Sequence, residues 1–185
     1  MKPKLIILEG ADGVGKSTLG KFLAQYFNGV YFHCTATKLL IPAMHDYQQN
    51  VLENVTDNIC LGRTVILDRF WISEMIYGGV LRPNNPHGFS WQHFASECRD
   101  LDPIYVICSC ESAIQRHVEH KDPAHPYEDS TYDKIFREYK AHWDVNKNTP
   151  NYMLYDMDHQ GACLDRVGRQ IYAKFNDYFK AKHVR

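Results

Sequence analysis

Near the N-terminus, residues 10 to 17 have the types and spacing of a phosphate-binding loop, G-x-x-x-x-G-K-[ST]. Glycines let such a loop turn tightly, so that its backbone N–H groups point at phosphate oxygens. The pattern predicts that Lys16 reaches the β- and γ-phosphates of ATP and that the Ser17 hydroxyl holds Mg²⁺. The residues expected to cradle the phosphates are Gly10, Ala11, Gly13, Val14, Gly15, Lys16, Ser17 and Thr18.

The flanking segments are those that the motif requires. Residues 4–9 form a short apolar run that predicts a buried strand. Residues 18–27 carry apolar side chains at the spacing of one helix face. The N-terminus of such a helix adds partial positive charge beside the loop, so this segment predicts an anion site.

A second group of reactive side chains follows the apolar segment 64–67. Asp68 and Arg69 stand side by side where that predicted strand ends. The planar guanidinium of Arg69 suits a phosphate acceptor, and Asp68 could orient Arg69 or a metal-bound water. The next helix would line an acceptor pocket with Phe70, Ser73, Glu74 and Tyr77. The alternative is a surface salt bridge followed by a helix that faces the core.

The elements that must position these residues alternate between strand and helix. Predicted strands are 4–9, 30–34, 64–67, 103–108 and 152–155. Helical patterns separate them, and Gly78-Gly79 is expected to end the helix that follows Arg69. This alternation predicts an α/β fold with a five-stranded parallel sheet and helices on both faces. Ligands bind such sheets at the carboxyl ends of the strands.

Composition restricts the class of protein. The chain has 185 residues, 44% of them hydrophobic, and a formal net charge of −1. We expect one domain over 1–185, and no basic field that would hold nucleic acid. No apolar run reaches transmembrane length, so the expected location is cytoplasmic, without a membrane partner. Small-molecule nucleotides are the expected partners.

The chain resembles thymidylate kinases at two motifs. Residues 8–18, LEGADGVGKST, are similar to the family's EG-x-DG-x-GKST opening. Residues 67–70, LDRF, with Ser73 and Tyr77, resemble its DR[YFH]…S…AY segment. Phe136, Arg137 and Tyr139 resemble residues of the helix that follows the family's lid. The resemblance implies a three-layer P-loop kinase fold that transfers the ATP γ-phosphoryl group to a nucleoside 5′-monophosphate.

The same resemblance implies roles for individual residues. Arg69 would hold the acceptor phosphate, and Asp12 would lie near metal, phosphate or sugar. Tyr77 would close on the sugar and favour a deoxyribose. A mobile lid over about 117–130 would close on ATP, with Arg116 as its catalytic cation. The resemblance also implies a homodimer.

The sequence departs from the family pattern at two places. Where the family carries an Arg-Glu-Pro-Gly-like stretch, this chain has Lys38, which could replace the missing arginine. Glu74 stands where the family tends to have a neutral amide or hydroxyl. An ionised carboxylate only accepts hydrogen bonds, and guanine offers two donors where thymine offers one. We therefore expect dTMP as the leading acceptor, with dGMP possible. Candidates to stack on the base are Phe70, Trp71 and Tyr47.

Two other functions fit parts of the sequence. A deoxynucleoside kinase acts on a 5′-hydroxyl and needs a carboxylate base near the end of the second strand. Residues 33–38 contain none, although Asp68 could serve. A low-turnover ATP-binding regulatory protein would need no second pocket, and the segment 68–77 argues against it.

Overall fold

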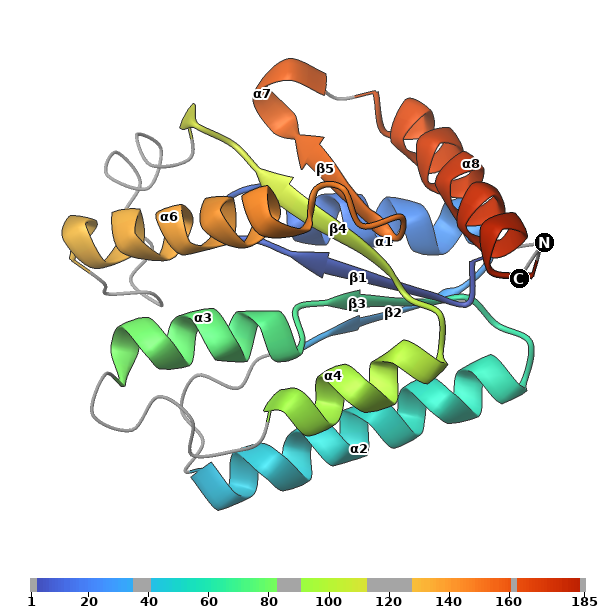
Figure 1. Ribbon diagram of the computed structural model, residues 1–185, viewed down its shortest axis with the longest axis horizontal. Helices are drawn as coiled ribbons and strands as arrows, with labels where there is room; N and C mark the ends of the chain where they lie inside the picture. Colours follow the sequence, from blue (N-terminus) through green and yellow to red (C-terminus); the bar gives the residue numbers. More distant parts are fainter. Residues whose placement is uncertain (1–2, 35–40, 83–90, 113–127, 161–162, 184–185) are drawn as a thin grey trace.

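A computed structural model describes residues 3–34, 41–82, 91–112, 128–160 and 163–183. A five-stranded sheet forms its centre (Figure 1). The strands are β1 (Leu5–Glu9), β2 (Val30–His33), β3 (Val65–Asp68), β4 (Ile104–Ser109) and β5 (Tyr152–Asp156). Their order is β2-β3-β1-β4-β5, and every neighbouring pair is parallel. The predicted five-stranded parallel sheet is confirmed.

Burial explains the composition of the strands. All residues of β1 and β3 are buried, which matches their nearly continuous apolar sequence. The edge strand β2 is only partly buried and mixes tyrosine, phenylalanine and histidine. The apolar central strands therefore form the core, and β1 and β3 deliver their carboxyl ends to the middle of the sheet.

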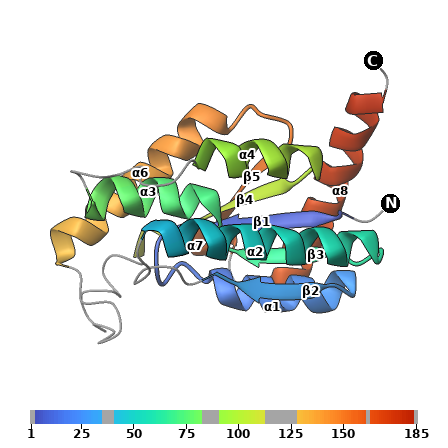
Figure 2. The ribbon, with the colours of Figure 1, turned by 90° about the horizontal axis from the view of Figure 1, so that it is seen from below.

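Helices cover both faces of the sheet, as predicted (Figures 1 and 2). The helices are α1 (Lys16–Phe27), α2 (Ile41–Cys60), α3 (Trp71–Leu81), α4 (Trp91–Asp100), α6 (Asp129–Asn146), α7 (Met157–Gln160) and α8 (Leu164–His183). Adjacent residues of β1 mark the two faces. Leu8 lies against Gly20 of α1, whereas Glu9 bonds to Ser73 of α3 and Tyr139 of α6. Helix α8 packs on α1, and α3 contacts α4 and α6.

Two elements differ from the sequence expectation. Helix α3 continues through Gly78 and Gly79 to Leu81, and the amide of Arg82 donates to the Gly78 carbonyl at 3.0 Å. Each helical glycine costs about 1 kcal/mol relative to alanine, and burial of the neighbouring Ile76 and Tyr77 outweighs that cost. The short helix α7 was not predicted. The Asp156 carboxylate caps it by accepting from the Asp158 amide at 3.0 Å.

Within the described ranges, no helix is both long and apolar enough to cross a membrane. Four described cysteines are buried, namely Cys34, Cys98, Cys108 and Cys110, and Cys60 and Cys163 are exposed. Most of the chain's thiols thus belong to the packed interior.

Candidate active site

The phosphate-binding loop connects β1 to α1 and has the backbone that its glycines permit. Gly10, Gly13 and Gly15 have φ of 152°, 76° and 80°. A Cβ at Gly10 would collide with the Cys108 carbonyl oxygen, so the loop also needs glycine to pack against β4. Gly15 precedes the first residue of α1, which places the helix N-terminus at the loop.

Lys16 is held inside this loop. Its side chain is only 6% exposed, and Nζ donates to the Ala11 carbonyl at 2.5 Å. Burial, together with the positive charge of Arg69, lowers the Lys16 pKa to about 8. A phosphate group would compensate for the lost hydration and favour the charged form further, so the buried lysine is prepared for an anion.

Asp68 ends β3 beside the loop, because β3 is the neighbour of β1. Its Oδ2 accepts from Ser17 Oγ at 2.6 Å and Tyr31 OH at 2.7 Å, and lies 3.0 Å from His33 Nδ1. Burial opposes ionisation, but the Lys16 charge and these hydrogen bonds prevail and lower the Asp68 pKa.

The Asp68 carboxylate fits a magnesium ion. Its Oδ1 is buried and has no hydrogen-bond partner in the part of the chain that the structure describes. A buried carboxylate oxygen without a donor is costly, and a bound cation would satisfy it. Carboxylate and hydroxyl oxygens are the hard ligands that Mg²⁺ prefers, so Asp68 and Ser17 together suit this metal.

Arg69 occupies an unusual backbone position for a residue with a side chain. Its φ is 72°, and its amide donates to the Leu8 carbonyl at 2.9 Å. The guanidinium pairs with Asp12 and donates to Tyr77 OH at 3.0 Å and to Ser73 Oγ at 3.3 Å. Such strain costs about 1–3 kcal/mol and persists where surrounding contacts enforce it. These contacts aim Arg69 toward the phosphate-binding loop.

Several of the predicted residues line one cleft at the carboxyl ends of β1 and β3. It has a volume of about 270 Å³ and is lined by Asp12, Gly13, Gly15, Lys16, Ser17, Thr18, His33 and Arg69. Tyr77 joins this group through Asp12, whose Oδ2 accepts from Tyr77 OH at 3.0 Å. The two motifs are therefore brought together, although Ser17 and Asp68 are 51 positions apart in the sequence.

Three predicted side chains lie differently from the expectation. The Phe70 ring is 1% exposed and packs edge-on against Phe94, so it belongs to the core. Glu74 is paired with Arg82, so it is neither a lone carboxylate nor a solvent-facing residue. Trp71 stacks on Trp91 with ring centres 5.8 Å apart.

Two predicted cations lie outside the described residues. Lys38 and Arg116 fall in the ranges 35–40 and 113–127, as does most of the expected lid over 117–130. Their roles stay predictions.

The sequence analysis missed a buried carboxylate, Glu9, that lies behind the helices α3 and α6. Glu9 is fully buried and accepts from the Phe70 amide at 2.8 Å, from Ser73 and, at 3.4 Å, from Tyr139 OH. Burial raises the Glu9 pKa above its ordinary value. The available signal was a single charged residue at the end of an apolar run. Its partners lie far away in the sequence, so the network itself was not readable.

Comparison with known proteins agrees with this geometry. A curated thymidylate kinase from Brachyspira hyodysenteriae is 25% identical over 80% of this chain and 88% of its own length. A thymidylate kinase from Desulfotalea psychrophila is 31% identical over 42% of this chain and 51% of its own length. No family model matches the chain.

Solved structures share the whole fold. The YorR protein of Bacillus subtilis, solved with phosphorylated GDP, aligns with a TM-score of 0.60, 19% identity and 98% coverage of both chains. Thymidylate kinase from Candida albicans aligns with a TM-score of 0.57 and 15% identity over 96% of this chain and 92% of its own.

The fold and the cleft define a P-loop nucleotide kinase architecture. The chain thus shares the fold of nucleotide kinases of known structure and is similar in sequence to thymidylate kinases.

Proposed function

We propose that the protein transfers the γ-phosphoryl group of ATP to the 5′-monophosphate of a deoxynucleoside, with dTMP favoured and dGMP accepted. The observation that carries this proposal is the position of Arg69. Its guanidinium lies in the same cleft as Lys16, and one nitrogen of that guanidinium, Nη2, is bonded to both Asp12 and Tyr77. A cation fixed beside a triphosphate loop suits an acceptor that is itself a phosphate.

Phosphoryl transfer requires positioning and neutralisation of charge more than a covalent nucleophile. Lys16 would hold the β- and γ-phosphates, and the loop amides would cradle them. Ser17 and Asp68 would hold Mg²⁺, which neutralises charge on the phosphates when bound. Arg69 would bring the acceptor phosphate in line. A monophosphate oxygen is already an anion, so no general base is needed.

Tyr77 supports a preference for deoxyribose. Its hydroxyl bonds to both Asp12 and Arg69, and its ring lies 4.7 Å from the Arg69 guanidinium carbon. A rigid ring beside the acceptor phosphate would leave little room for a 2′-hydroxyl on the bound sugar.

The Glu74–Arg82 pair supports keto bases. Glu74 supplies a hydrogen-bond acceptor and Arg82 supplies donors, and Arg82 Nε is buried without a partner among the described residues. Thymine and guanine each combine a ring N–H with a carbonyl, whereas adenine and cytosine carry an amino group in place of that carbonyl. The pair thus supports the acceptors dTMP and dGMP that we expect from the family resemblance and from Glu74.

A deoxynucleoside kinase would use a carboxylate to remove a proton from a 5′-hydroxyl. Asp68 is engaged by Ser17, Tyr31 and His33, and its lowered pKa makes it a weak base. The family resemblance adds three further parts to the proposal. Lys38 would replace the family's arginine, a lid over about 117–130 would close on ATP with Arg116 as its cation, and two chains would form a homodimer.

An acceptor panel tests the proposal. Purified protein is incubated with Mg·ATP and dTMP, dGMP, dAMP, dCMP, their ribose counterparts, thymidine or deoxyguanosine, and products are separated by chromatography. We expect diphosphates from dTMP and, more slowly, from dGMP. Products from nucleosides alone would overturn the proposal. The Glu74→Gln variant should reduce kcat/KM for dGMP relative to dTMP by about tenfold.

A further inference from the structure

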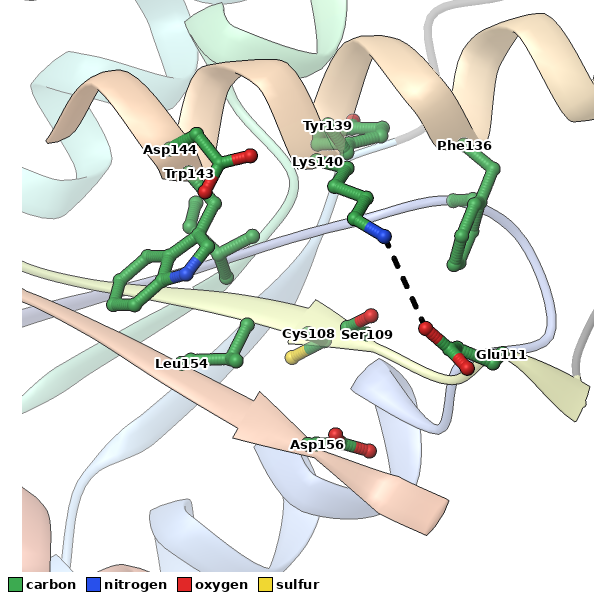
Figure 3. Close-up of a pocket in the computed structure, with 12 residues that line it drawn as sticks. Cys108, Ser109, Glu111, Phe136, Tyr139, Lys140, Trp143, Asp144, Leu154 and Asp156 are labelled. Carbon is green, nitrogen blue, oxygen red and sulfur yellow. Dashed lines mark ion pairs between the residues drawn. The ribbon is translucent and has the colours of Figure 1, made fainter. Parts of the chain in front are cut away.

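A second cavity lies between helix α6 and the strands β4 and β5 (Figure 3). Its volume is about 200 Å³. We call it the α6 pocket. Its twelve lining residues are Ala11, Ile107, Cys108, Ser109, Glu111, Phe136, Tyr139, Lys140, Trp143, Asp144, Leu154 and Asp156. Only Ala11 belongs to the phosphate-binding loop, so this cavity is separate from the cleft that holds Lys16 and Arg69.

The sequence builds this cavity from two regular patterns. On α6, residues 136, 139, 140, 143 and 144 recur at the spacing of one helix face. On the sheet, Ile107 pairs in register with Leu154, and Ser109 pairs with Asp156. The two pairs are two residues apart along each strand, and therefore face the same side of the sheet. The roof and floor are thus rigid elements rather than loops.

The walls are chiefly aromatic and aliphatic. Phe136, Tyr139 and Trp143 come from α6, and Leu154 lies below Trp143 on β5 (Figure 3). Flat ring faces beside an apolar floor suit a flat ligand, since stacking on aromatic side chains is favourable for any nucleobase. The volume is below the roughly 300–1,000 Å³ of pockets for drug-sized ligands, so one or two fused rings would fill it.

The polar groups of the described lining disfavour a phosphate-bearing ligand. Among the lining residues that the structure describes, Glu111, Asp144 and Asp156 are acidic and Lys140 is basic. Lys140 Nζ lies 3.9 Å from Glu111 Oε1, so its charge is already partly balanced. Asp144 is likewise paired with Lys147 at 3.2 Å, and Asp156 Oδ2 lies 2.7 Å from His159 Nδ1. The described lining therefore holds no unpaired cation for a phosphate, while its remaining carboxylate oxygens can accept from N–H groups.

We propose that the α6 pocket binds an uncharged nitrogen heterocycle, namely a nucleobase or a nucleoside without phosphate, in addition to the nucleotides of the catalytic cleft. Tyr139 connects the two sites, because its ring lines this pocket and its hydroxyl lies 2.7 Å from Ser73 Oγ. Ala11 connects them as well, since its carbonyl accepts from Lys16. A ligand here touches residues that position the catalytic groups, so it would act as an effector.

Calorimetric titration with adenosine, guanosine and thymidine tests this site, with saturating Mg·ATP and acceptor monophosphate analogue present. We expect one nucleoside to bind with one-to-one stoichiometry under these conditions, and its monophosphate to bind the pocket at least fivefold more weakly. Repeating the titration with the Lys16→Ala variant separates this site from the proposed phosphoryl transfer, which that variant should lack. Absence of binding, or loss of binding when nucleotide is added, would overturn the proposal.

Two variants locate the site independently. Leu154→Phe fills the floor, and Trp143→Ala removes a wall; each should weaken nucleoside binding at least tenfold. Val145→Ala is the matched control, because Val145 lies on the same helix, is 83% exposed and does not line the pocket. Circular dichroism shows whether each variant folds. If one of them does not fold, the nucleoside affinity of the other variant tests the site. Unchanged affinity in a folded variant would contradict the proposal.

Discussion

At the scale of single residues, three buried ionisable groups lie in or next to the cleft. Lys16, Asp68 and Glu9 are 6%, 0% and 0% exposed. Burying a charge is costly unless partners compensate for the lost hydration. Asp68 and Glu9 have donors around them, whereas Lys16 has a backbone carbonyl and a lowered pKa. The lysine is therefore the group whose state depends most on a bound anion.

Nucleotide affinity should depend on pH through Lys16. Its pKa is about 8 before binding, and phosphate charge must raise it. A group whose pKa rises on binding gives full affinity below its free pKa and loses it above that value. We expect ATP affinity to be constant up to about pH 8 and to fall up to tenfold per pH unit above it. Calorimetric titration at pH 7 to 10 measures this.

The Lys16→Met variant provides the comparison for that titration. It should bind ATP weakly and without the alkaline decline. An equal decline in the variant would assign the effect to another group.

Arg69→Ala should affect the acceptor far more than ATP. Loss of a bidentate cation should raise the acceptor KM about 10²-fold, with the ATP KM changed less than threefold. Steady-state kinetics with each substrate varied in turn measure both constants. Arg63→Ala, at an exposed position outside the cleft, is the control. Similar losses for the two substrates would contradict the proposed role.

Prediction from sequence worked for residues with fixed spacing and failed for those with distant partners. Lys16, Ser17 and Arg69 follow directly from motifs next to predicted strands. The pairing of Glu9 with Ser73, and of Tyr132 with the Asp12 carbonyl, joins positions that no local pattern relates. Phe70 was misplaced because its side chain turns into the core, and the helical spacing did not fix that orientation.

At the scale of elements, two glycines in helices have opposite consequences. Gly20 lies where α1 packs on the sheet, and a Cβ there would overlap the Tyr31 ring and meet Leu8 Cδ1 at 3.1 Å. Gly79 lies in α3, and a Cβ there would meet nothing within 4 Å. The first glycine permits close packing, whereas the second only lowers helix propensity.

Alanine substitutions should therefore change stability in opposite directions. Gly20→Ala should lower the free energy of unfolding by about 1–3 kcal/mol, because overpacking outweighs helix propensity. Gly79→Ala should raise it by about 0.5–1 kcal/mol. Urea denaturation of both variants measures these changes. Stabilisation by Gly20→Ala would show that α1 does not approach β2 as closely as the structure indicates.

Periodicity predicted the elements well because each strand is apolar and each helix has an apolar stripe. It failed at Gly78-Gly79, where tertiary burial overrides the local preference of glycine. It also missed α7, since a four-residue helix has no period and depends on the Asp156 cap.

At the scale of the whole molecule, the order of strands assembles the site. Placing β1 between β3 and β4 sets Asp68 and Arg69 beside the loop after β1. Glu111, which follows β4, lies next to Lys140 of α6. The alternation of elements predicted a parallel sheet, but not which strands are neighbours. Long-range pairings of this kind cannot be read from spacing in a single sequence.

The packing of α6 on the rest of the molecule should make stability sensitive to acid. His142 lies 6.4 Å from the Trp71 ring and 5.8 Å from the Tyr152 ring, and burial lowers its pKa to about 4. A folded pKa below the unfolded value means stability that is complete above about pH 6.5 and is lost as pH falls toward 4.

His142→Phe should remove that contribution. We expect the wild type to lose about 1–3 kcal/mol more than the variant between pH 7 and pH 4. Urea denaturation at these two pH values measures the difference, with the exposed Val145→Ala as control. Parallel pH profiles for wild type and variant would contradict this role.

The central claim is phosphoryl transfer from ATP to a nucleoside monophosphate in the cleft of Lys16 and Arg69. Phosphorus-31 NMR of a mixture of enzyme, Mg·ATP and dTMP tests it most directly, with Lys16→Met as the comparison. We predict that the ATP γ-phosphorus signal disappears as the β-phosphorus signals of dTDP and ADP grow equally, and that the variant shows neither change. Release of inorganic phosphate without dTDP, or dTDP formation by the variant at the wild-type rate, would contradict the account.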